Sequence, residues 1–94
     1  MSLVREDSIP KILQILSRKH CILVLEMIGR TDMAHWTELE RSVPRGNLLH
    51  LVRELGKLGL IEKIYAPQTS RAIGYKITDL GNHILITVNK LRSG

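Results

Sequence analysis

Apolar residues recur at helical spacing over the first third of the chain. Isoleucine and leucine return every three or four positions between residues 9 and 16, a spacing that predicts an amphipathic helix. Ser8 can cap this helix, and Pro10 suits its first turn. Beyond the polar stretch SRKH at 17–20, residues 21–29 are apolar on nearly every side, as in helices that their neighbours bury. The pattern therefore predicts two successive helices, with the second one in the core.

A helix-turn-helix is predicted in the middle of the chain. HWTELERSV, at 35–43, predicts a short helix in which Thr37 and Glu40, three positions apart, form a capping box. The tripeptide PRG at 44–46 predicts a turn. A longer helix is expected over about 46–58, because leucine and valine fall on one stripe at about 100° per residue and cations fall opposite.

The pattern changes from helical to alternating directly after this longer helix. Gly59 suits the left-handed residue that ends a helix. Alternating residues over about 61–77 predict two short strands joined by the polar loop PQTSR, and Thr78 can cap a last helix over about 79–91. The expected order is helix, helix, helix-turn-helix, hairpin, helix. We therefore expect a mainly α fold with a small β-hairpin wing, a winged helix-turn-helix, as one domain over 1–94.

Composition narrows the class of protein further. Of the 94 residues 44% are apolar, which is enough for the core of one domain. Cys21 is the only cysteine, so no disulfide can form within the chain, as is usual in a reducing cytosol. The start MSLVRED is too polar for a signal peptide, and the longest uncharged apolar run, CILVL, is far shorter than the ~20 residues that cross a membrane. We expect a cytoplasmic protein with no membrane partner.

The positive charge is concentrated in one part of the chain. The formal net charge is +5, and residues 43–78 hold six basic and two acidic residues, which is +4. The remaining residues hold eight basic and seven acidic groups that nearly cancel. A local excess of this kind is what a nucleic-acid-binding surface requires.

Motifs along most of the chain resemble those of known regulators. VPRGNLLHLVRELGKLGLIEKI, at 43–64, is similar without a gap to the recognition helix and first wing strand of MarR-type and HxlR-type regulators. Their Leu-x-x-x-Gly-Leu-Ile/Val pattern stands here at Leu55, Gly59, Leu60 and Ile61. RKHCILVLEMI and HWTEL resemble the HxlR-type core helix and the start of the next helix, and GYKITDLG resembles the motif that closes the wing. The resemblance covers roughly residues 9–85 and implies a dimeric DNA-binding transcriptional regulator.

The chain departs from these families at three places. Where HxlR-type proteins often carry a redox-sensing cysteine, the chain reads REDSI, so redox sensing does not carry over. Asp79 and His83 do not have the spacing of the metal ligands on the last helix of ArsR-type sensors, and we expect no metal and no cofactor. Leu49 stands where family members usually have a polar DNA-facing residue, although an apolar side chain can touch a thymine methyl group.

Candidate DNA contacts lie on the polar side of the longer helix and in the wing. Arginine pairs with guanine and asparagine with adenine in the major groove, and lysine or arginine also binds phosphates. A cation in the wing loop can reach a minor groove or a phosphate. The plainer interpretation is a solvated helix face and an ordinary hairpin loop. The candidates are Arg45, Asn47, His50, Arg53, Lys57 and Arg71.

The first and last helices carry apolar residues that could join two protomers. Dimerisation through such flanking helices would let two recognition helices meet successive major grooves. The alternative is that these residues close the core of a single chain. The interface candidates are Ile12, Leu16, Ile84, Val88 and Leu91.

No residue pattern indicates catalysis. Glu38 and Glu40 have no histidine or cysteine partner at a catalytic spacing, and no nucleophile motif or phosphate-binding loop is present. Trp36 and Cys21 are expected to pack in the core. We expect a sequence-specific double-stranded DNA-binding transcriptional regulator and a homodimer, not an enzyme. The alternative is a winged-helix protein–protein interaction module without DNA binding. A small-molecule effector is a third alternative, which no polar constellation indicates.

Overall fold

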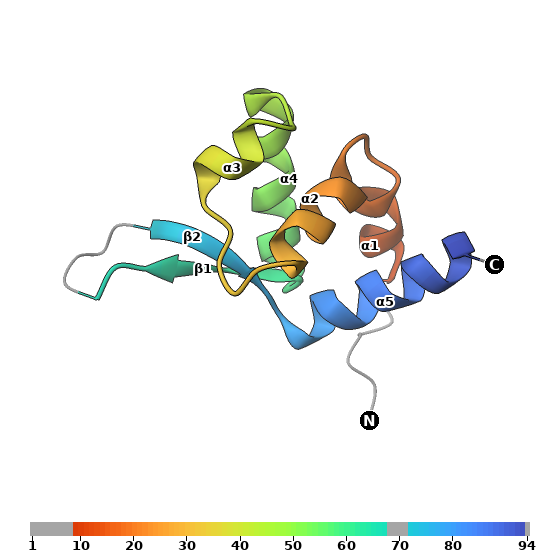
Figure 1. Cartoon of the computed structure of the whole chain (residues 1–94). Helices are drawn as coiled ribbons and strands as arrows, with labels where there is room; N and C mark the ends of the chain where they lie inside the picture. The colour runs from red at the N-terminus through yellow and green to blue at the C-terminus, as the bar shows by residue number, and fades with distance from the viewer. Residues whose placement is uncertain (1–8, 68–71, 94) are drawn as a thin grey trace.

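The computed structural model describes residues 9–67 and 72–93 of the chain (Figure 1). Within these ranges it contains five helices and one antiparallel hairpin in the order α1-α2-α3-α4-β1-β2-α5. The mainly helical fold class with a β-hairpin wing is thus confirmed. The elements are α1 Ile9–Leu16, α2 Cys21–Gly29, α3 Trp36–Glu40, α4 Arg45–Lys57, β1 Ile61–Tyr65, β2 Ala72–Ile77 and α5 Asp79–Ser93.

Helix α2 lies at the centre of the core, as its apolar sequence predicts. Cys21, Val24, Leu25 and Ile28 of α2 are all fully buried. Leucines of α3 and α4 and Leu60 before β1 belong to the same cluster, which also includes residues of α1, β1 and α5. No polar or charged residue among those described is buried, so the side chains of the core stabilise the fold by apolar burial.

The end of α4 has the hydrogen bonds of a Schellman motif. Gly59 takes the left-handed conformation with φ of 77°. The N–H of Leu60 donates to the carbonyl oxygen of Leu55 at 2.9 Å, and the N–H of Gly59 donates to that of Gly56 at 3.1 Å. Leu60 and Leu55 are both buried. The sequence prediction for Gly59 is confirmed, and the motif turns the chain directly into β1.

Thr78 joins the start of α5 to the end of α4. Its hydroxyl oxygen accepts a hydrogen bond from the N–H of Gly81 at 3.0 Å, the expected N-cap bond. The same hydroxyl donates to the carbonyl oxygen of Gly59 at 2.6 Å, and the N–H of Thr78 donates to Leu60 at 3.1 Å. The two helix ends and the base of the wing therefore form one junction.

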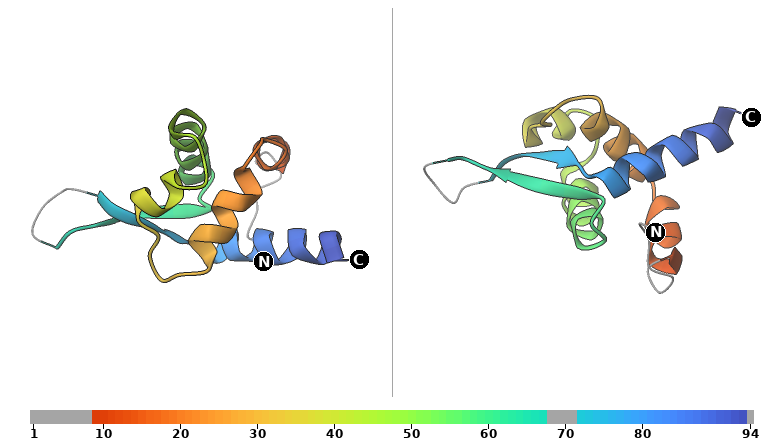
Figure 2. Two further views of the ribbon diagram at one scale, coloured as in Figure 1. Left: turned by 45° about the horizontal axis from the view of Figure 1, so that its top comes forward. Right: turned by 90° about the horizontal axis from the view of Figure 1, so that it is seen from below.

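The wing extends away from the helices, while α5 extends on the opposite side (Figures 1 and 2). Ile61 pairs with Ile77 at its base. Tyr75 exchanges two hydrogen bonds with Ala34, from the connection between α2 and α3, at 2.7 and 2.9 Å. This pairing, which the sequence did not reveal, ties β2 to the helical core and limits how the wing can tilt.

Two local predictions in the helix-turn-helix are wrong. Thr37 caps no helix, because α3 begins at Trp36. The Glu40 carboxylate instead accepts a hydrogen bond from the indole N–H of Trp36. Arg45 and Gly46 belong to α4, not to a turn, because Pro44 stands at its N-cap and its carbonyl oxygen accepts the first helical hydrogen bond. Proline's fixed φ suits this place at a helix start.

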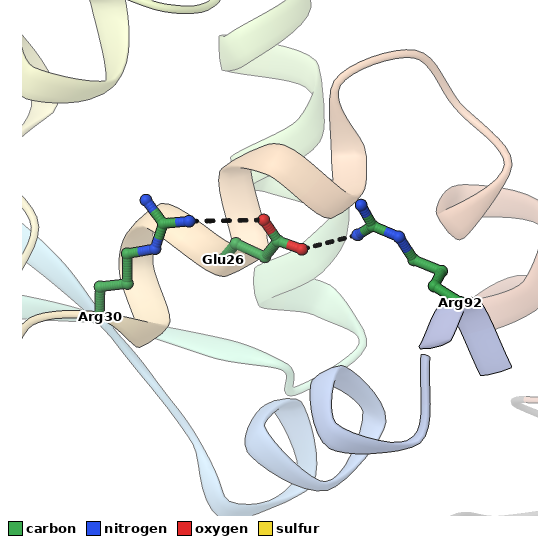
Figure 3. A network of polar contacts seen from close by, with 3 residues as sticks. All are labelled: Glu26, Arg30 and Arg92. Atoms are coloured by element: carbon green, nitrogen blue, oxygen red, sulfur yellow. Dashed lines mark hydrogen bonds and ion pairs between the residues drawn. The ribbon is translucent and has the colours of Figure 1, made fainter. Parts of the chain in front are cut away.

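Figure 3 shows the ion pair that connects the last turn of α5 to α2. The Glu26 carboxylate lies between two arginines, 2.7 Å from the Arg92 guanidinium and 3.8 Å from that of Arg30. The Glu26 side chain is only 21% exposed, whereas Arg30 and Arg92 are largely exposed. The charge-assisted bond to Arg92 holds α5 against the helical core at a second point, far from the Thr78 junction.

The interface candidates of the flanking helices differ in exposure. Ile12 is 4% exposed and therefore belongs to the interior of the chain. Leu16 and Ile84 pack partly against the core, whereas Leu91 is 78% exposed. The most buried α5 side chain is Leu85, which is not among the interface candidates.

Candidate nucleic-acid interface

Helix α4 has one buried face and one exposed face. Leu48, Leu51, Val52 and Leu55 are buried and hold the helix on the core. The exposed face carries Arg45, Asn47, Leu49, Arg53 and Lys57, with His50 half-buried at its edge. The apolar stripe thus determines which way the candidate DNA contacts point.

A cleft between α4 and the wing forms one side of this face. We call it the α4–wing cleft, and it encloses about 530 Å³. Arg53 and Lys57 of α4 meet Lys63 of β1 here, and Leu49 and Tyr65 face the same space. It is lined by Leu49, Val52, Arg53, Gly56, Lys57, Ile61, Glu62, Lys63, Tyr65 and Tyr75.

Most cations of this face have no acidic partner. Within the described ranges, no carboxylate lies within 4.0 Å of Arg45, Arg53 or Lys63. Glu62, the one acidic residue of the α4–wing cleft, pairs with Lys76 at 3.1 Å. The unpaired side chains are exposed and are therefore accessible to an anionic partner.

Asn47 and His50 lie on the other side of α4. There the helix faces α1 and the turn at 17–20, which packs beside it. Two hollows of about 490 and 400 Å³ share Arg18 and His50, and we call them together the α1–α4 cleft. The structure therefore divides the predicted DNA contacts between the two edges of one helix, with Lys57 lining both clefts.

Three cations of the α1–α4 cleft are absent from the sequence prediction. Lys11 of α1 and Arg18 and Lys19 of the following turn line this cleft. Counted along the sequence, their charges are offset by carboxylates elsewhere, such as Glu26, which binds Arg92. In the sequence, the adjacent cations Arg18 and Lys19 were the only indication of this part of the surface. They reach the candidate interface because α1 packs against α4.

Arg71, the wing candidate, lies outside the described residues. Its role in DNA binding stays a prediction from the sequence. The described part of the wing contributes Lys63 and Tyr65 to the α4–wing cleft.

Other reactive groups of the chain are engaged in packing. Cys21 is fully buried, and burial raises the pKa of its thiol to about 11, so the reactive thiolate is scarce at neutral pH. Trp36 packs against the core, and the centroid of its ring lies 6.4 Å from that of Tyr75. The prediction that Trp36 has a packing role is confirmed. Burial, followed by the charge of Tyr65, raises the pKa of Tyr75. Within residues 9–67 and 72–93, no three potential ligands gather as a metal site would require.

Comparison with known proteins places the fold. No family model matches the chain, and no curated protein sequence matches it. A solved structure from Porphyromonas gingivalis W83, of a protein assigned to the MarR family of transcriptional regulators, matches 99% of this chain and 94% of its own, with a TM-score of 0.73 and 25% identity. The chain has the winged helix-turn-helix fold of MarR-type regulators.

Two further solved structures share this MarR-type fold. The proposed transcriptional regulator ytfH from Salmonella typhimurium aligns over 89% of this chain and 77% of its own, with a TM-score of 0.72 and 20% identity. MarR aligns over 89% of this chain and 63% of its own length, with a TM-score of 0.71 and 21% identity. In this MarR-type frame, α3 and α4 form the helix-turn-helix and β1 with β2 forms the wing. None of the described helices has the length and apolar character needed to cross a bilayer.

Proposed function

We propose that the chain is a sequence-specific, double-stranded DNA-binding transcriptional regulator. The observation that carries this proposal is the exposed face of α4, where Arg45 and Arg53 have no acidic partner within the described residues. The cationic clefts on both sides of the helix support it. The solved structure from Porphyromonas gingivalis, assigned to a family of transcriptional regulators, agrees with it.

In the proposed complex, α4 lies in the major groove, which is wide enough to admit a helix. Arg45 and Arg53 bind guanine edges or phosphates, and Asn47 binds adenine. Lys57, Lys63 and His50 contact the backbone beside the groove, where they position the helix without reading sequence. Arg71 binds the backbone or a minor groove from the wing loop.

We further propose a homodimer formed through α1 and α5. Leu13 of α1 is 63% exposed, and Ile86 and Leu91 of α5 are 47% and 78% exposed. Leu16, Ile84 and Val88 would extend the same apolar contact. A two-fold dimer would present two α4 helices to major grooves about 34 Å apart, one helical turn of DNA.

A protein–protein interaction module is the second candidate. Leu49 and Tyr65, at 49% and 54% exposure, are the exposed hydrophobic side chains of this surface that such a module would use. Under it, the α4–wing cleft would bind another protein and the chain would have no affinity for duplex DNA.

The proposal is tested by selecting bound sequences from a library of random duplexes with the purified full chain. We expect one motif to be enriched, with two inverted half-sites whose centres lie about 10 base pairs apart. The library carried through the same rounds without protein is the control. Recovery of no motif would contradict sequence-specific DNA binding, and a single half-site would contradict the dimer while preserving the DNA-binding proposal.

A further inference from the structure

Leu49 lies between two unpaired arginines on α4. Residues four positions apart are neighbours on a helix surface, so Arg45, Leu49 and Arg53 form one row along the exposed face. The Leu49 side chain is 49% exposed and lines the α4–wing cleft. A partner that binds this face of α4 therefore meets a cation, then an apolar side chain, then a second cation.

The apolar surface around Leu49 continues across the α4–wing cleft. Tyr65 of β1 is 54% exposed and lines the same cleft, together with the buried Val52 and Ile61. Lys63 adds a third unpaired cation to Arg45 and Arg53. The complementary partner has to offer a small apolar group within a few ångströms of several anionic groups.

Duplex DNA offers this combination in its major groove. The C5-methyl group of thymine is the apolar group that base pairs present there, and phosphates border the groove on both sides. A protein partner would need acidic residues around an apolar anchor, whereas every thymine-containing duplex already supplies both. The arrangement of charges thus favours DNA as the occupant.

We propose that Leu49 determines specificity by contacting the C5-methyl group of a thymine, while Arg45 and Arg53 bind guanines or phosphates on either side of it. This inference rests on the proposed function and adds the base that α4 selects. It also gives the exposed leucine a role in binding, since Leu49 would lose its contact with water only in the complex.

The inference is tested on the duplex recovered by selection, with each thymine replaced in turn by deoxyuridine, which lacks only the C5-methyl group. For the wild-type chain, we expect one replacement in each half-site to weaken binding about fourfold, the value of burying one methyl group. Leu49→Ala should bind the thymine and deoxyuridine duplexes equally. Leu23→Ala, at an α2 position of 37% exposure that lines neither cleft of α4, is the matched control and should keep the wild-type preference.

The outcomes separate this inference from the proposed function. Sequence-specific binding that no deoxyuridine replacement weakens would overturn the role of Leu49 and leave the proposed function intact. A thymine preference that survives in Leu49→Ala would also overturn it. Absence of binding to any duplex would overturn both.

Discussion

Gly81→Ala is expected to destabilise the fold by about 3 kcal/mol, at the upper end of the usual cost of overpacking. A Cβ atom at Gly81 would lie 2.0 Å from the carbonyl oxygen of Leu60 and 2.8 Å from the Ile77 side chain. The Leu60 carbonyl is backbone and accepts the hydrogen bond of Thr78, so it cannot move without opening the junction of α4, α5 and the wing. Thermal unfolding of the full chain should show a midpoint about 12–24 °C below that of the wild type.

Gly56→Ala is the matched control for this substitution. Gly56 lies within α4, and nothing stands within 4 Å of the place its Cβ would take. Alanine is favoured over glycine in a helix by about 1 kcal/mol, so this variant should unfold at a higher temperature than the wild type. If Gly81→Ala were as stable as Gly56→Ala, α5 would not be packed against Leu60 as described.

Replacing Arg45 and Arg53 together by glutamine is expected to lower the affinity for the selected duplex about 100-fold. Each arginine that binds a base edge or phosphate contributes roughly tenfold, and glutamine removes the charge while keeping a polar side chain of similar reach. Both side chains are exposed and neither packs in the core, so the fold should be unaffected. Fluorescence anisotropy of a labelled duplex measures the change.

Arg30→Gln is the control for the loss of charge. Arg30 follows α2 and lines neither cleft of α4, and its side chain is 74% exposed with only a long contact to Glu26. It should bind the duplex within about twofold of the wild type, because a distant exposed charge is screened by salt. If the double variant and the wild type bound the duplex with equal affinity, α4 would not be part of the DNA interface.

The fold class could be predicted from the sequence because its signals are local. Gly59 permits the left-handed turn that ends α4, and Thr78 caps the helix that follows the wing. The same local reasoning failed at Thr37, because α3 begins one residue earlier, at Trp36, and the Glu40 carboxylate accepts a hydrogen bond from the Trp36 indole.

The candidate interface could be predicted only in part, because it depends on packing between distant segments. The exposed cations of α4 follow from the helical period. The contribution of Lys11, Arg18 and Lys19 depends on α1 lying beside α4, and that of Lys63 and Tyr65 on the angle of the wing. The spacing of residues along the sequence does not indicate how closely α1 and the wing approach α4.

The dimer prediction depended on which face of α5 meets the core. Of the interface candidates, Leu91 is exposed, whereas Ile84 packs partly against the core and Leu85, which was not a candidate, is buried. Gly81, one turn before Leu85, has no side chain, which lets this side of α5 approach Leu60 closely.

The affinity for a generic duplex of about 30 base pairs, measured across a range of salt concentrations, tests DNA binding most directly. Binding through phosphate contacts predicts a log–log slope of about −0.9 for each phosphate neutralised. Contacts from both clefts of α4 and from the wing predict a slope of about −4 to −6 for one protomer. An affinity that is absent at low salt, or that does not change with salt, would contradict the DNA-binding account and favour a protein partner for the same surface.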